Sequence, residues 1–312
     1  MAQFIVIGDA TVDQMYFVEE FPELGGEAIA QRSSMEPGGA GGTIAIALTS
    51  LGHQVRISTR VGKGPFADLA LRNLRQAKVD LSLVQYDDEL QTSSVTLIIS
   101  GEGQRTMLSS AGASRQLDAS QLKADDIKSC DALVLSAYSL ISGKQRDYAI
   151  QAFNHAREGR LTTFMDMGSG AVDLIKGNMF ENIKGLDFLL MNEHELFRLT
   201  NEDNISSAVK VLNHEGIEGM IIKLGAFGSM VVTPQFQELV EAFHIDEVVD
   251  TTGAGDYYTA AFAHGIMKGY DVLYAARLGN VAGALNATKV GAQSYPIDAA
   301  KLEYLAKGFN PT

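Results

Sequence analysis

Short apolar runs alternate with segments of helical periodicity along most of the chain. The apolar run over residues 4–7 ends at Gly8-Asp9 and predicts a buried strand. From about residue 131 onwards, runs that predict strands alternate regularly with runs that predict helices. Alternation of this kind is typical of right-handed βαβ units and predicts a parallel sheet with helices on both faces.

The expected helices follow the 3.6-residue period of an amphipathic helix. In the first of them, apolar residues recur at Ile44, Ala47, Leu48 and Leu51, and Gly52 stands where a C-terminal cap belongs. We expect strands at residues 4–7, 55–61, 132–135, 162–166, 188–191 and 219–223, and helices at residues 43–51, 66–76, 145–155, 195–199, 205–213, 256–267 and 274–288.

Some segments with strand character are not framed by helices. Residues 27–32 read as a short exposed strand, and residues 94–99 and 106–109 read as a hairpin joined by Gly101-Glu-Gly103. We expect a small β-sheet lid outside the main layers, near residues 12–36 and 92–110. No repeat or linker interrupts residues 1–312, so the prediction is one doubly wound α/β domain with this lid.

Composition excludes several classes of protein. The chain has 312 residues, 46% of them hydrophobic, and a formal net charge of −13. The negative charge argues against binding nucleic acid or an anionic membrane surface, since both need a basic face. The single cysteine, Cys130, can form no intramolecular disulfide and belongs to no zinc motif. The N-terminal apolar run is too short for a signal peptide and no run reaches the ~18 apolar residues of a membrane span, so we expect a cytoplasmic protein.

The most informative segment is Asp250-Thr-Thr-Gly-Ala-Gly-Asp256, which precedes a predicted helix. Gly253, Ala254 and Gly255 would leave backbone N–H groups open at the helix N-terminus, and such groups attract negative charge. The carboxylate of Asp256 stands beside them. An anion hole next to a general base is what phosphoryl transfer to a hydroxyl requires.

The same segment resembles the C-terminal signature of the ribokinase/PfkB family of sugar kinases. Gly38-Gly-Ala-Gly-Gly42, followed by a helix ending at Leu51-Gly52, resembles the N-terminal signature of that family. The similarity extends from Ile5 to about Pro296. It implies a doubly wound α/β domain with a small β lid, and phosphorylation of a sugar-like hydroxyl that depends on ATP and Mg²⁺.

The resemblance implies roles for residues on the acceptor side. Asp256 would be the catalytic base, with Gly253 to Gly255 as the anion hole. Asp13 would bind substrate hydroxyls, because a carboxylate accepts two hydrogen bonds; taken alone, Asp13 reads equally well as a solvated turn residue. Gly38 and Gly39 would let the substrate approach the backbone closely.

On the nucleotide side, Asn192-Glu-His-Glu195 matches the Asn-x-x-Glu element of the family. Asn192 and Glu195 would organise a network of Mg²⁺, water and phosphate; the alternative is an N-cap with a capping-box acid. Lys223-Leu-Gly-Ala-Phe-Gly228 resembles the loop beneath the nucleotide, where Gly225 and Gly228 permit close contact. Lys223 either reaches a phosphate or is a solvated strand end.

Other positions match the family less closely. Asn280 lies on the helix that flanks the adenine pocket in the family. Asp250, Thr252 and Gly291 correspond to positions around a monovalent-cation site in many members, and their oxygens would suit K⁺.

The chain also departs from the family pattern. Thr11 and Thr43 stand where many members carry Asn, so they keep a hydroxyl but lose the paired donor and acceptor of an amide. This departure makes ribose itself a less favoured acceptor. Arg105 lies in the predicted lid hairpin and either contacts an anionic group of the substrate or belongs to the lid surface or a homodimer interface.

We therefore expect an ATP-dependent kinase acting on a sugar-like small molecule. A nucleoside kinase of the same fold is the nearest competitor. A noncatalytic protein that senses sugar or nucleotide is the alternative from another class, and the loss of Asp256 or of the glycine-rich turn would have favoured it. An NAD-dependent dehydrogenase is poorly supported, because the spacing of Gly38–Gly42 is not G-x-G-x-x-G.

Overall fold

The main layer is a large, mostly parallel sheet. The computed structural model describes residues 1–101, 105–175, 179–294 and 296–308, and within them nine strands run in the order β13-β12-β11-β10-β9-β8-β1-β4-β5. Neighbours from β11 to β5 are parallel, whereas β12 and β13 pair antiparallel at one edge. The strands are β1 (Gln3–Ile7), β4 (Gln54–Val61), β5 (Asp80–Tyr86), β8 (Ala132–Ser136), β9 (Thr162–Asp166), β10 (Phe188–Asn192), β11 (Met220–Lys223), β12 (Ser229–Val232) and β13 (Gln237–Val240).

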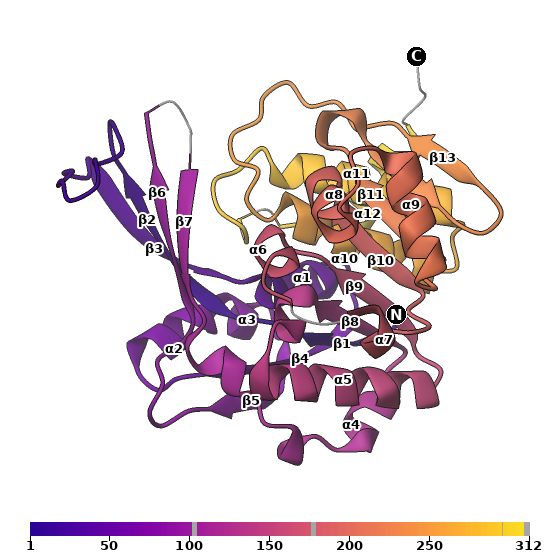
Figure 1. The fold of residues 1–312 in the computed structure, drawn as a ribbon, viewed down its shortest axis with the longest axis horizontal. Helices are drawn as coiled ribbons and strands as arrows, with labels where there is room; N and C mark the ends of the chain where they lie inside the picture. The colour runs from indigo at the N-terminus through magenta and orange to yellow at the C-terminus, as the bar shows by residue number, and fades with distance from the viewer. Residues whose placement is uncertain (102–104, 176–178, 295, 309–312) are drawn as a thin grey trace.

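Helices cover both faces of this sheet (Figure 1), as the predicted βαβ alternation requires. Along β1, Phe4 and Val6 belong to one apolar core, while Ile5 and Ile7 belong to the core on the opposite face. One face is covered mainly by α1 (Ala40–Ser50), α10 (Ala254–Met267), α11 (Val272–Asn286) and α12 (Ala299–Lys307), and the other mainly by α5 (Gly143–Glu158), α8 (Glu193–Thr200) and α9 (Ile205–His214).

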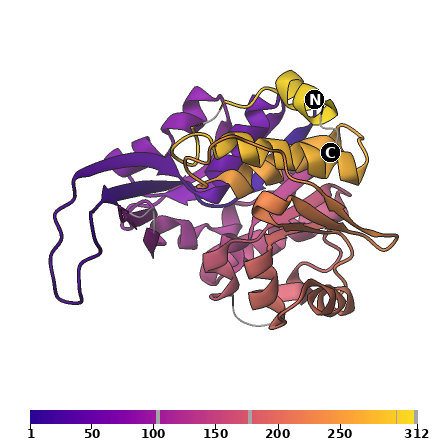
Figure 2. The same ribbon diagram turned by 90° about the horizontal axis from the view of Figure 1, so that it is seen from above.

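A separate four-stranded sheet forms the lid and stands away from the main sheet (Figure 1). Its order is β3-β2-β6-β7, with β2 (Thr11–Phe17), β3 (Arg32–Gly38), β6 (Ser94–Ile99) and β7 (Arg105–Ser110). The connection between β2 and β3 reaches far beyond the α/β body (Figure 2). Because β2 begins shortly after β1 ends, the base of the lid lies next to the carboxyl edge of the main sheet.

The doubly wound fold with a small sheet is confirmed, but several element predictions were wrong. The expected strand at residues 27–32 begins only at Arg32, because pairing with β2 runs from Phe17↔Arg32 to Thr11↔Gly38. The expected helix 66–76 is two helices, α2 (Pro65–Ala70) and α3 (Arg72–Gln76), separated at Leu71. Strands β2, β12 and β13 and helix α12 were not expected. Within the described residues, no helix has the length and apolar character needed to cross a membrane.

A pair of buried histidines ties the start of the chain to the C-terminal helices. The N–H of Ala2 donates to His53 Nδ1 (3.1 Å), so the ring hydrogen of neutral His53 is on Nε2 and points to His264 Nδ1, 2.8 Å away. His264 Nε2 then carries the hydrogen and lies 3.7 Å from the Glu303 carboxylate. Burial, the second ring and the nearby positive charges of Lys268 and the N-terminus lower the pKa of His53 to about 4. Burial also lowers the pKa of His264.

Stability should therefore depend on pH through this pair. A histidine whose folded pKa lies below its unfolded value of 6.5 contributes stability above pH 6.5 that is lost as the pH falls toward 4. Between pH 7 and pH 5, His53 should remove about 2 kcal/mol from the free energy of unfolding. Urea unfolding across this range should show a shallower pH dependence for His53→Gln than for wild type.

The matched control is His214→Gln, at an exposed position at the end of α9. It should keep the wild-type pH dependence. An equal slope in the His53 and His214 variants would contradict the assignment.

Candidate active site

Polar side chains gather where the parallel strands of the main sheet end. Asp9 follows β1, Asp166 ends β9, Asn192 ends β10 and Lys223 ends β11. The carboxyl ends of parallel strands share one edge, and ligands of open α/β sheets bind outside that edge, where the strand order reverses. The order reverses at β1, which lies between β4 and β8.

The N-terminus of α10 faces this edge and begins with a tight glycine turn. Gly253 is the N-cap with φ 80°, and a Cβ there would come within 2.6 Å of the Ala292 carbonyl oxygen. The N–H of Ala254 donates to the Thr251 carbonyl (3.2 Å), so this amide is occupied, unlike the expectation. In the described part of the chain, the N–H groups of Gly255 and Asp256 make no backbone hydrogen bond. The open amides thus lie one residue further into the helix than the sequence suggested.

Lys223 lies next to the start of α10. Its Nζ is 3.3 Å from the place a Cβ on Gly255 would occupy, and 2.6 Å from Asp166 Oδ1. Thr259 Oγ1 donates to the same carboxylate oxygen at 2.6 Å. The side chains of Lys223 and Asp166 are only 13% and 6% exposed, so the alternative of a solvated strand end is wrong.

The charges around Asp256 do not balance. Burial and the carboxylate of Asp166 raise the pKa of Asp256 well above 3.8, and the ammonium of Lys223 partly offsets this shift. Burial disfavours the charged form of Lys223, yet the carboxylates of Asp166 and Glu195 raise its pKa above 10.5. One ammonium therefore faces the carboxylates of Asp166, Glu195 and Asp256, and the excess negative charge suits a bound cation.

Asn192 and Glu195 form the capping box that was the alternative interpretation. The Asn192 side chain accepts from Glu195 N (2.8 Å), and Glu195 Oε2 accepts from Asn192 N (2.9 Å). Ser169 Oγ holds the other carboxylate oxygen at 2.9 Å. The capping box holds the buried Glu195 carboxylate beside Asp166 and Lys223. Glu195 can therefore cap α8 and also help to bind a cation.

The expected acceptor residues lie together at the base of the lid. Thr11 Oγ1 donates to Asp13 Oδ1 (2.8 Å), and burial raises the pKa of Asp13 to about 6. Asp13 is therefore a half-buried strand residue and not a solvated turn residue. A side chain on Gly38 would collide with the Asp13 carboxylate. Thr43 is buried on α1, and its Oγ1 donates to the carbonyl of Gly39 (3.0 Å).

Two expected nucleotide residues have clear packing roles. A side chain on Gly228 would collide with the Val240 carbonyl, so the approach of β13 already requires glycine there. Asn280 Nδ2 donates to the carbonyls of Val240 (3.0 Å) and Glu241 (2.9 Å) and pins the end of β13. Gly225, with φ 60°, has open space where a side chain would stand.

The three residues of the expected cation site are neighbours. Asp250 Oδ1 accepts from Thr252 N (2.9 Å) and Thr252 Oγ1 (2.6 Å), and its Oδ2 accepts from Gly291 N (2.8 Å). This network ties the segment before α10 to the segment after α11.

Arg105 is an expected site residue that lies away from the other expected acceptor residues. Its backbone pairs with Ile99, while Val95, the partner of Asp13, pairs with Ser109. Arg105 therefore begins β7 at the end of the lid away from Asp13, and its side chain lies outside the described part of the structure.

Sequence reasoning missed four residues near the site. Gln145 Nε2 donates to Asp9 (2.6 Å), and burial raises the pKa of Asp9. Both Asp9 and Asp166 come at the end of a buried parallel strand, which is the signal that could have identified them. Tyr138, whose hydroxyl accepts from Gly170 N (3.3 Å), carries no such signal.

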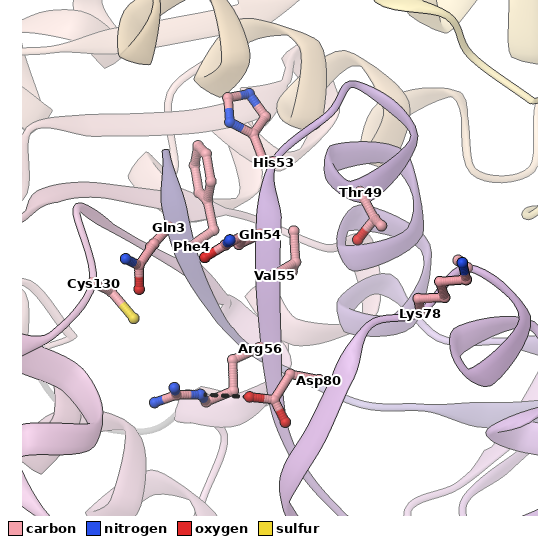
Figure 3. A pocket seen from close by; sticks show the side chains of 11 residues that line it. Gln3, Phe4, Thr49, His53, Gln54, Val55, Arg56, Lys78, Asp80 and Cys130 are labelled. Carbon is pink, nitrogen blue, oxygen red and sulfur yellow. Dashed lines mark hydrogen bonds and ion pairs between the residues drawn. The ribbon is translucent and has the colours of Figure 1, made fainter. Parts of the chain in front are cut away.

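A separate hollow of about 460 Å³ lies at the opposite edge of the sheet, at the amino ends of β1 and β4 (Figure 3). Arg56 within it is already paired with Asp80 at 3.1 Å. Cys130 also lines it, and burial raises the pKa of this thiol, which disfavours the nucleophilic thiolate form. None of the expected site residues lines this hollow.

Comparison with known proteins agrees with this geometry. The chain is 28% identical over 310 residues to a deoxyribokinase of Salmonella typhi, with 96% of this chain and 98% of the relative covered. It is 27% identical over 311 residues to an ATP-dependent ribose-1-phosphate kinase of Halopiger xanaduensis, with 99% and 100% covered. Its fold matches Arabidopsis thaliana ribokinase complexed with ribose and ATP, with a TM-score of 0.84, 23% identity, and 98% and 99% of the chains covered.

The family model described as pfkB family carbohydrate kinase matches residues 1–300, nearly the whole chain. The chain therefore belongs to the pfkB family of ATP-dependent carbohydrate kinases.

Proposed function

We propose that this kinase transfers the γ-phosphoryl group of ATP to a hydroxyl of a sugar or sugar-like small molecule, with Asp256 as general base. The observation that carries the proposal is the half-buried Asp256 carboxylate beside the open amides of α10. A carboxylate whose pKa is raised toward neutrality suits a base that must take a proton in the transition state.

In the proposed reaction, the Asp256 carboxylate takes the hydroxyl proton as the acceptor oxygen bonds to the γ-phosphorus. The bond between that phosphorus and the bridging oxygen breaks, and ADP leaves with the bonding electrons. The open amides of Gly255 and Asp256 and the N-terminal dipole of α10 would stabilise the charge on the transferred group. Lys223 would add a fixed positive charge beside these amides, without leaving its place next to Asp166.

Asn192, Lys223 and Gly225 are proposed to face the nucleotide, with Gly228 and Asn280 shaping that side of the site. Mg²⁺ usually keeps several waters and binds few carboxylates, and Glu195 would hold it through water. The unbalanced carboxylates fit this ion, which would neutralise phosphate charge; no cage of three or more direct ligands occurs among the described residues. K⁺ is proposed near Asp250, Thr252 and Gly291.

The acceptor is proposed to bind Asp13 through its hydroxyl groups. Thr11, Gly38, Gly39 and Thr43 would complete this side of the site. Contact between Arg105 and an anionic group of a substrate stays a prediction. A cytoplasmic location is also proposed, since the enzyme consumes ATP.

A homodimer through the lid is the remaining part of the proposal. Met35 and Leu108 are 46% and 63% exposed. They lie on the same face of the lid as Gln14, because Met35 pairs with Gln14 and Leu108 pairs with Thr96, the other partner of Gln14. This face is opposite to Asp13, because neighbouring strand residues point to opposite faces. A second copy of the chain would bury these apolar side chains.

The dimer can be tested by sedimentation velocity. Wild type should sediment as a dimer, whereas Met35→Lys combined with Leu108→Lys should sediment as a monomer. Met107→Lys, on the opposite face and 55% exposed, is the matched control and should remain dimeric. A monomeric wild type at micromolar concentration would contradict the proposal.

Loss of the proposed base should abolish turnover without unfolding the protein. Asp256→Asn should lower kcat about 10³-fold, because general base catalysis contributes roughly 10²- to 10⁴-fold. ATP binding and the unfolding midpoint should stay close to wild type. In wild type, kcat should rise with pH through a pKa well above 3.8.

Asp147→Asn, at an exposed position on α5, is the control and should keep full activity. The assay is ADP release with Mg-ATP and a panel of pentoses, ketohexoses, sugar acids and nucleosides. Turnover of Asp256→Asn near the wild-type rate would disprove the base assignment.

The effect of the Lys223 charge on phosphoryl transfer can be separated from the contribution of Lys223 to stability. Lys223→Met leaves the Asp166 carboxylate buried without its ion pair and should cost about 3–5 kcal/mol of stability. Combining it with Asp166→Asn should recover much of the stability, because no unpaired charge remains. If Lys223 stabilises the transferred group, kcat of the double variant should stay low.

Lys63→Met is the control for this measurement. It breaks an ion pair with Asp88 whose side chains are 64% and 76% exposed, and should change stability by less than about 1 kcal/mol. Full recovery of kcat in the double variant would show that the pair is only structural.

A further inference from the structure

One side-chain amide reaches the acceptor side of the site from the far end of the chain. Gln293 follows α11, and its Nε2 lies 3.4 Å from the Gly38 carbonyl oxygen and 3.5 Å from Thr43 Oγ1. It is also 3.3 Å from the place a Cβ on Gly42 would occupy. The segment after α11 therefore lies against the N-terminal glycine loop.

The two threonine hydroxyl groups on the acceptor side already donate their hydrogens to other groups of the protein. Thr11 Oγ1 donates to Asp13, and Thr43 Oγ1 donates to the carbonyl of Gly39. A hydroxyl has one hydrogen to donate, so both threonines offer a ligand only lone pairs. The carboxylate of Asp13 also accepts. Among these side chains, Gln293 is the one that offers hydrogens to an oxygen of the acceptor.

The orientation of the Gln293 amide follows from its neighbours. The carbonyl of Gly38 can only accept, so the NH₂ end of the amide must face it. The other end, Oε1, accepts from Asn73 Nδ2 on α3 at 3.1 Å. The contacts of Nε2 at 3.4 and 3.5 Å are longer than the usual 2.9–3.0 Å for N–H···O, so its hydrogens are weakly bonded and free to serve a closer oxygen.

The same segment also touches the anion hole. The carbonyl of Ala292 packs within 2.6 Å of the place a Cβ on Gly253 would occupy. A hydrogen bond from Gln293 would thus hold an acceptor oxygen relative to the turn that begins α10.

We propose that Gln293 is a specificity-determining residue of the acceptor site, whose NH₂ donates a hydrogen bond to a hydroxyl oxygen of the sugar. This inference rests on the kinase function proposed above. A sugar hydroxyl both donates and accepts, so one vicinal pair can donate to Asp13 and accept from Gln293. The site would then select acceptors that carry both oxygens over deoxy analogues that lack one, since an unpaired polar group is costly.

Steady-state kinetics with D-ribose, 2-deoxy-D-ribose and D-fructose at fixed Mg-ATP tests the proposal. Gln293→Ala should raise the KM of the best sugar at least about fivefold and leave the KM of ATP within twofold. The loss should be smaller for a deoxy analogue that lacks the oxygen concerned. Thr43→Asn combined with Gln293→Ala should recover part of the lost affinity, because it returns an amide donor next to the same position.

Two variants separate this role from packing. Asn73→Ala frees Gln293 Oε1 and should raise the sugar KM by less than Gln293→Ala does. If Gln293→Ala fails to fold, a higher sugar KM in Asn73→Ala with an unchanged ATP KM supports the proposal, and an unchanged sugar KM overturns it. Gln54→Ala, an exposed glutamine in the hollow at the opposite edge (Figure 3), is the matched control and should change neither KM.

An unchanged sugar KM in Gln293→Ala, or an equal rise in both KM values, would overturn the inference while the kinase function stands. If wild type phosphorylates none of the sugars, the proposed function fails for this panel. Calorimetric titration of the same sugars then decides the inference: weaker binding to Gln293→Ala supports it, and equal or absent binding overturns it.

Discussion

The candidate site at the carboxyl edge of the sheet depends on one buried ion pair. Asp166 at the end of β9 and Lys223 at the end of β11 meet at 2.6 Å, and Thr259 of α10 donates to the same carboxylate. A buried charge without a partner is costly, so each of these groups holds the others in place. Two strands and the helix that carries Asp256 are thereby fixed relative to one another.

This constraint also explains the local electrostatics. Because the Lys223 side chain pairs with Asp166 and packs next to Gly255, it does not extend into solvent. Burial and the remaining carboxylates raise the pKa of Asp256, and the excess negative charge at this edge favours a bound cation.

Much of the fold could be predicted because strands buried on both faces and amphipathic helices leave clear patterns. Strand β9 and helices α9 and α10 agree with the predicted ranges within two residues at each end. Strand β2 was missed because Asp13 and Gln14 interrupt its apolar pattern where it borders the site. Strands β12 and β13 were missed because they form a half-exposed hairpin at the edge of the sheet. The continuous helix at residues 66–76 was wrong because a periodic apolar pattern does not reveal the break at Leu71.

The sequence by itself determined the family and the reaction class, and it predicted most residues of the candidate site, since glycine-rich turns and strand-end carboxylates are local signals. Only the tertiary structure decided which polar groups are already occupied. The Ala254 amide, the hydroxyls of Thr11 and Thr43 and the ammonium of Lys223 each have partners that no local pattern reveals. The approach of Gln293 to Thr43 joins positions 250 residues apart. Hydrogen bonding and burial depend on which groups the folded chain brings within about 3 Å, and that distance is set by packing, not by sequence spacing.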